Sequence, residues 1–180
     1  SSARPMRKLS ALRRFLSERA GIATHVRPLL DDPVGVDDEV WRGLAALGAT
    51  GVLVGEEYGG AGMGMVEAGA VAEQLGAALH PGPWLSSAVA AARALTRTGI
   101  QDPALLSGIA DGTTIATVGP LSGPRPGIEE TDAGATLRGE LGALPDAAAA
   151  DVLLVLADDR SDTVLCAVNQ SSPGVTLTPR

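Results

Sequence analysis

The stretch Val54-Gly-Glu-Glu-Tyr-Gly-Gly-Ala-Gly-Met-Gly64 joins an apolar run, GVLV at 51–54, to an amphipathic segment at 65–79. A strand, a glycine-rich loop and a helix in this order are typical of a nucleotide-phosphate site. A P-loop needs a lysine in the loop, but the single lysine is Lys8, and a Rossmann fingerprint needs a third glycine where Met65 stands. We therefore interpret the glycines as a sharp turn between packed helices, so that GVLV need not be a sheet strand.

The composition is that of a globular protein with an acidic balance. Of 180 residues, 45% are hydrophobic but only 2% are aromatic, so the core must consist mostly of Ala, Leu and Val. The formal net charge of −7 argues against nucleic acid as a partner. Residues 1–30 nevertheless hold seven of the fourteen Lys and Arg residues. A basic helix there either contacts a membrane or an acidic partner, or presents an ordinary solvated face.

The sequence predicts neither a membrane span nor a secretory leader. No stretch reaches the roughly 18 apolar residues of a transmembrane helix, and residues 1–30 lack a continuous apolar run. The one cysteine, Cys166, excludes an internal disulfide and a thiolate metal site. We expect a cytoplasmic protein without a bound metal, in which Cys166 is a small core residue.

The first half of the chain has helical periodicity. Helices are predicted over 7–21, from the N-cap Asp37 to a stop at Gly48, over 65–79, over 83–99, and from Asp102 and Pro103 onward. The helix over 83–99 is apolar around most of its circumference, so we expect it to be central and buried. In the helix over 65–79, one apolar stripe is expected, formed by Ala68, Val71, Ala72, Leu75, Ala78 and Leu79.

After residue 112 the pattern changes to short segments rich in β-branched and aliphatic residues. Strands are predicted within 113–119, 135–141, 151–157 and 163–169, separated by Gly, Pro and Asp. Helices followed by strands indicate an α+β protein. We expect an all-helical domain over residues 1–112 and a small β-sheet or barrel domain, incomplete in this chain, over residues 113–180.

Isolated polar residues form no catalytic constellation by spacing alone. His25 and His80 do not make an HxxxH or HxxE motif, and His80 is expected to interact with the last carbonyls of a helix. Glu73 lies mid-helix beside the apolar stripe, which leaves a buried functional role open. Ser86 and Ser87 have no GxSxG context and no base nearby in sequence.

The order of longer motifs resembles the acyl-CoA dehydrogenase family. Residues 41–64 resemble the family's W-x-x-L-A-x-x-G and L-x-x-P-E-x-Y-G-G-x-G segments, with Gly55 in place of the proline. Four further segments match in the family's order over residues 8–180: AEQLGAALHPGPWLSS (72–87), LLSGIADGTTIATV (105–118), LRGELGALPDAAAADVLLVLA (137–157) and SSPGVTLTP (171–179). The resemblance implies an N-terminal helical domain followed by a central β-domain.

The resemblance also implies FAD-dependent α,β-dehydrogenation of an acyl-CoA thioester. The cofactor would contact Leu121, Ser122, Leu144 and Pro145, and the acyl pocket would be lined by Gln74 and Leu75. The family's catalytic glutamate belongs to a C-terminal helical domain, so no catalytic residue is expected in this chain. Implied partners are an electron-transfer flavoprotein or similar acceptor and other subunits, in a homo- or hetero-oligomer such as a dimer or tetramer.

Three positions depart from the family pattern. Leu141 replaces a lysine, Ala143 replaces an aromatic residue that packs near the flavin, and Pro145 stands where many relatives have a hydroxyl residue. Two alternatives therefore stay open beside the active flavoprotein subunit. One is a non-catalytic structural subunit of a heteromeric acyl-CoA dehydrogenase, and the other is a binding protein that reuses the fold.

Overall fold

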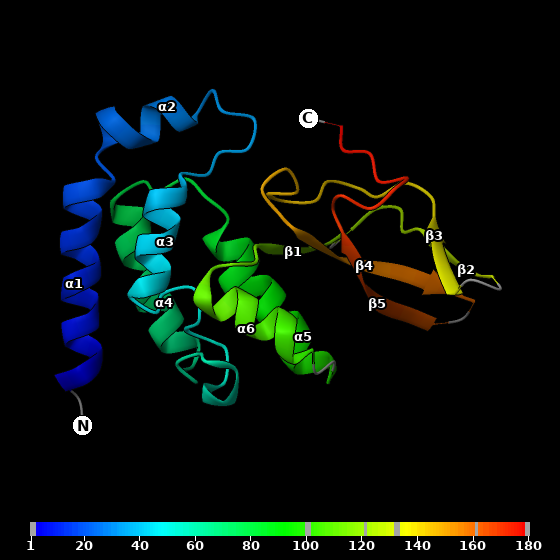
Figure 1. Ribbon diagram of the computed structural model, residues 1–180, viewed down its shortest axis with the longest axis horizontal. Coiled ribbons are helices and arrows are strands. Elements are labelled where there is room, and N and C mark those ends of the chain that lie inside the picture. The colour runs from blue at the N-terminus through cyan, green and yellow to red at the C-terminus, as the bar shows by residue number, and fades with distance from the viewer. Residues whose placement is uncertain (1–2, 100–101, 121, 132–133, 161, 179–180) are drawn as a thin grey trace.

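The computed structural model describes residues 3–99, 102–120, 122–131, 134–160 and 162–178, arranged as helices followed by one sheet (Figure 1). The longer helices are α1 (Ala3–Arg19), α3 (Asp38–Ala46), α4 (Met65–Ala77), α5 (Ala92–Thr98) and α6 (Pro103–Asp111). The short helices are η1 (Ile22–Val26), α2 (Arg27–Leu29), the 3₁₀ helix η2 (Glu56–Tyr58) and the π-helix η3 (Leu85–Ala91). The predicted α+β architecture is confirmed.

The helix ends lie where the cap residues predict them. The Asp37 side chain accepts hydrogen bonds from the N–H groups of Glu39 and Val40, and Asp102 accepts one from Leu105. Gly99 and Gly112 follow α5 and α6 in left-handed conformations, with φ of 70° and 76°. The division at residue 112 stays a prediction, which the change from α6 to the first strand at Ala116 supports.

The glycine-rich stretch is a turn that folds back on GVLV. Residues 51–54 form buried turns rather than a strand, and the N–H groups of Ala61, Gly62 and Met63 donate to the carbonyls of Gly51, Val54 and Val52. A Cβ on Gly60 would lie only 2.1 Å from the Val54 carbonyl oxygen. The main chains approach so closely that only glycine fits at this position.

The sheet is mixed and contains five strands: β1 (Ala116–Gly119), β2 (Gly127–Thr131), β3 (Gly134–Arg138), β4 (Val152–Asp159) and β5 (Asp162–Asn169). β4 pairs in parallel with β1 and antiparallel with β5, and its end pairs with β2. Four strands match the sequence prediction, whereas β2 was not predicted. Its sequence, GIEET, has two acids and one large apolar residue, so strand periodicity is weak there.

The main core lies among the helices and extends onto one face of the sheet. Leu44, Leu95 and Ile109 are at most 1% exposed, and Ala116 of β1 and Leu154 of β4 belong to the same cluster. The alternate residues Leu153 and Val155 form a second cluster on the other face, which the loop before β4 covers. The segment over 83–95 is mostly buried, as predicted, although Leu85 is exposed and its first part is the π-helix η3; residues 96–98 are exposed.

The predicted stripe on α4 is partly wrong. Ala72 and Leu79 are exposed, and Gln74 is buried instead, 8% exposed. Leu79 lies past the end of the helix, in a left-handed conformation with φ of 51°. Cys166, expected in the core, is half-buried on β5, and burial raises the pKa of its thiol.

The glycine turn predicts a contrast between two glycine substitutions. Gly60→Ala should lower the free energy of unfolding by about 3 kcal/mol, because its Cβ would meet main-chain atoms that cannot rotate away. The matched control, Gly69→Ala within α4, should raise it by about 0.5–1 kcal/mol, because a Cβ there meets nothing within 4 Å. Chemical denaturation of both variants measures the two values, and equal stability would contradict the close approach.

Candidate functional site

Two loops that the sequence assigned to the cofactor lie together at one edge of the sheet. Residues 122–124 follow β1, and residues 142–146 precede β4. A Cβ on Gly142 would lie 3.0 Å from the Ser122 carbonyl oxygen and 3.6 Å from Pro120, so the loops pack main chain against main chain. We call these two segments the two-loop edge.

The predicted cofactor residues differ in what they can offer at the two-loop edge. The Ser122 side chain is exposed, and its hydroxyl has no hydrogen-bond partner among the described residues. Leu144 is half-buried in the second apolar cluster, and Pro145 is exposed, with its carbonyl accepting from Thr117 Oγ1 at 2.6 Å. Leu121 lies outside the described residues.

These residues fit the flat ring of a flavin through packing and one hydroxyl. Ser122 can both donate and accept a hydrogen bond, and Leu144 and Pro145 present apolar surface. Pro145 has no N–H and no polar side-chain atom, so it supplies packing but no donor. Among residues 122–124 and 142–146, Ser122 is thus the only side-chain hydrogen-bond donor.

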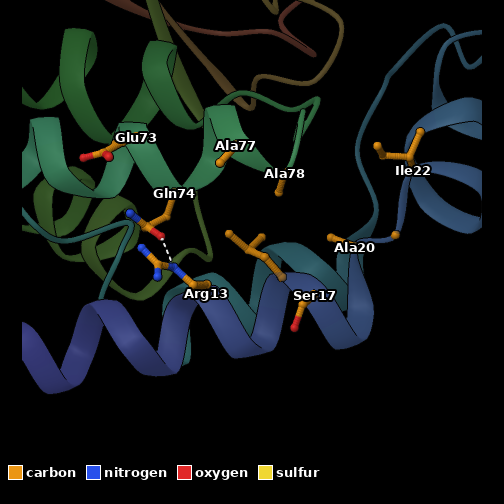
Figure 2. A pocket seen from close by; sticks show the side chains of 10 residues that line it. Arg13, Ser17, Ala20, Ile22, Glu73, Gln74, Ala77 and Ala78 are labelled. Carbon is orange, nitrogen blue, oxygen red and sulfur yellow. Dashed lines mark hydrogen bonds between the residues drawn. The ribbon is translucent and has the colours of Figure 1, made fainter.

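The predicted acyl-pocket residues lie elsewhere, around a groove between α1 and α4. The groove has a volume of about 370 Å³, and Figure 2 shows Gln74 pointing to Arg13, whose Nε donates to Gln74 Oε1 at 2.8 Å. Ala20, Ile22, Ala77 and Ala78 form an apolar side of the groove. Leu75 is 6% exposed and belongs to the main core.

The groove and the two-loop edge are therefore separate features. α1 lies at one end of the molecule and the sheet at the other (Figure 1), and Gln74 faces α1. Glu73 also lines the groove, where it is exposed rather than buried. A role of Gln74 and Leu75 in holding an acyl chain stays a prediction.

A second cluster, which sequence reasoning missed, contains both histidines. The rings of His25 and His80 stack with centroids 5.6 Å apart and planes 5° apart. None of their four nitrogens has a hydrogen-bond partner within the described ranges, although Asp37 Oδ2 lies 3.4 Å from His25 Nδ1. The prediction that His80 interacts with the last helix carbonyls is confirmed for its main-chain N–H, which donates to the Leu75 carbonyl at 3.0 Å, but not for its ring nitrogens.

The buried stack lowers the pKa of His80 to about 4. Burial contributes most, the charge of His25 adds to it, and Asp37 opposes it. The pKa of Asp37 is itself lowered, mainly because its carboxylate accepts the Val40 N–H. No group of three or more His, Cys, Asp or Glu side chains in the described part of the chain is arranged to hold a metal ion.

The histidine stack predicts acid sensitivity between pH 6.5 and about 4. His80 is neutral in the folded protein throughout this window, whereas the unfolded chain takes up a proton near 6.5. The contribution of His80 to the free energy of unfolding is thus complete above pH 6.5. It decreases by up to about 3 kcal/mol as the pH is lowered from 6.5 to about 4. The lowered pKa of Asp37 acts only below its ordinary value of 3.8, outside this window.

His80→Phe preserves an aromatic ring and removes the proton site. Denaturation of this variant at pH 7.0, 5.5 and 4.5 should therefore show a shallower loss of stability than the wild type. Equal slopes in the two proteins would show that His80 does not cause the acid sensitivity.

Comparison with known proteins identifies the family. Residues 8–112 match the model of the acyl-CoA dehydrogenase N-terminal domain. The chain is 36% identical over 104 residues to the acyl-CoA dehydrogenase IpdE2 of Mycolicibacterium smegmatis, a match that covers 57% of this chain and 32% of that protein. It is 34% identical over 119 residues to FadE34 of Mycobacterium tuberculosis, which covers 66% of this chain and 15% of that protein.

Solved structures show the same arrangement of helices and sheet. A chain of the ChsE4–ChsE5 complex from Mycobacterium tuberculosis has a TM-score of 0.83 at 27% identity, with 99% of this chain and 50% of that chain covered. A Tcur3481–Tcur3483 steroid acyl-CoA dehydrogenase variant has a TM-score of 0.81 at 27% identity, with 95% and 49% covered.

The chain thus spans about a third or less of the curated relatives and about half of these two solved chains. No helix in the described part of the chain is long and apolar enough to cross a bilayer. Family model, relatives and fold agree, and the chain belongs to the acyl-CoA dehydrogenase family.

Proposed function

We propose that this chain forms the helical and sheet part of a flavoprotein subunit that oxidises an acyl-CoA thioester between Cα and Cβ. The observation that carries the proposal is the two-loop edge. There Ser122 lies beside the 142–146 segment, and its own hydroxyl is exposed, with no hydrogen-bond partner among the described residues. This edge lies in a chain whose residues 8–112 match the family's N-terminal domain. FAD, when bound, supplies the acceptor for the hydride that leaves Cβ.

The residues of this chain would bind and orient rather than carry out proton transfer. Ser122 would hydrogen-bond the flavin ring, and Leu144 and Pro145 would pack against it. Gln74 and Leu75 would belong to the wall that excludes water from the acyl chain. The base that removes the Cα proton would come from another domain or another subunit.

The names of the relatives narrow the proposed substrate and partners. One solved neighbour at 27% identity is named a steroid acyl-CoA dehydrogenase, and another is a complex of two different chains. We therefore favour a CoA thioester with a bulky, ring-bearing acyl group, a cytoplasmic hetero-oligomer, and an electron-transfer flavoprotein as the electron acceptor.

A non-catalytic subunit of such a hetero-oligomer is the second candidate. Pro145 offers no hydrogen-bond donor, and Ala143 offers no aromatic surface, so the two-loop edge provides a single side-chain donor, Ser122, among its described residues. In this case the fold would serve assembly, and the flavin would belong to the partner subunit.

FAD binding separates the two candidates. The purified protein, alone and co-expressed with a candidate partner subunit, should take up FAD and show the visible absorption of oxidised flavin, which anaerobic acyl-CoA should bleach. Ser122→Ala should weaken FAD binding roughly 3- to 10-fold, the effect of one hydrogen bond. Thr98→Ala, which removes an exposed α5 hydroxyl bonded to the Ala94 carbonyl, is the control and should change nothing.

Failure to take up FAD in both preparations would contradict the catalytic proposal. Flavin uptake by the co-expressed complex that is insensitive to Ser122→Ala would assign the flavin to the partner subunit, and so favour the second candidate.

A further inference from the structure

Two consecutive serines connect the helical part of the molecule to the sheet and its loops. Ser86 and Ser87 of η3 are 7% and 1% exposed. Ser86 Oγ donates to Asp146 Oδ2, and Ser87 Oγ accepts the Ala116 N–H of β1 at 3.1 Å. In a π-helix, which has i→i+5 hydrogen bonds, the angle between successive side chains is smaller than the 100° of an α-helix. Both serines can therefore face the side on which the sheet and its loops lie.

The partner of Ser86 has an unusual conformation. Asp146 has a positive φ of 52°, which is uncommon for a residue other than glycine, although Asp adopts it more readily than most. The preceding residue, Pro145, accepts from Thr117 Oγ1 of β1 at 2.6 Å. The loop that includes 142–146 is thus hydrogen-bonded at Pro145 to the sheet and at Asp146 to η3. The bond from Ser86 stabilises the left-handed conformation of Asp146, which is otherwise unfavourable for a residue other than glycine.

We infer that Ser86 is a positioning residue: through Asp146 it fixes the 142–146 loop, so that η3 sets the shape of the two-loop edge without touching the flavin. A hydroxyl that donates to a carboxylate makes a stronger bond than a neutral pair. Loss of the hydroxyl frees an exposed carboxylate and leaves Asp146 without its restraint, so the change should be confined to the loop. The effect on flavin rests on the proposed function, whereas the effect on the loop does not.

We call the Ser86–Asp146 hydrogen bond the tether. Hydrogen–deuterium exchange of the full chain tests the tether without reference to activity. Ser86→Ala should raise the exchange of peptides that cover residues 142–150 and leave those of α1 and α3 unchanged. Asp146→Asn keeps an acceptor oxygen and tolerates positive φ, so its exchange should stay close to wild type. Asp146→Gly removes the tether and the strain together, so exchange in the loop should rise without a loss of global stability.

FAD affinity, measured by titration in the same preparations, tests the consequence for the edge. Ser86→Ala should weaken FAD binding roughly 3- to 10-fold, whereas Asp146→Asn, in which Ser86 still has an acceptor, should keep most of the affinity of the wild type. Thr98→Ala again serves as the folded control that should change neither readout.

The two proposals fail in different ways. Unchanged exchange at 142–150 in folded Ser86→Ala would overturn the tether, as would a rise spread evenly over the whole chain. Loosening of the loop with unchanged FAD affinity would overturn the positioning role while the tether stands. A wild type that binds no FAD would contradict the proposed function, but the exchange result would still decide the tether.

Discussion

One buried polar contact joins the sheet to the helices within the apolar core that they share. The Ala116 N–H lies on β1, where Ala116 is fully buried, and a buried N–H without a partner costs about 1–3 kcal/mol. Ser87 of the π-helix η3, which is 1% exposed, supplies the acceptor. Because Ser86 is its neighbour, the same helix that docks the sheet also reaches the 142–146 loop. The same two serines therefore hold both the sheet and the 142–146 loop against η3.

Sequence periodicity and cap residues were sufficient for the longer helices and for four of five strands, whereas the short helices η1, α2 and η2 were not predicted. Asp37, Asp102, Gly99 and Gly112 act locally, within four residues, so their role is readable from the sequence. The start of α3, the end of α5 and both ends of α6 were therefore predictable before any geometry was known. The family was predictable from the order of the longer motifs.

The features that were missed depend on contacts between distant residues. Gln74 is buried because Arg13, 61 residues away, supplies its hydrogen bond. Ser86 meets Asp146 across 60 residues, and the two histidines meet through the packing of the η1 segment beside the end of α4. No period or short motif encodes such pairs. The expectation that Ser122 and residues 144–145 act together came from the family pattern, and the proximity of Ser122 to Gly142 supports it.

The residues that we propose to bind the flavin lie apart from the titratable side chains of the groove. The two-loop edge offers a hydroxyl and apolar surface at the sheet, while the described polar residues of the groove between α1 and α4 lie at the far end of the molecule. In the function that we propose, these loops would orient a flavin ring, and the base would come from elsewhere in a larger assembly. The structure of the protein with FAD and its partner subunit, solved by crystallography or cryo-electron microscopy, tests this account most directly. We predict density for the flavin ring against Ser122 and the 142–146 loop. A fully occupied flavin that contacts neither loop would contradict the account.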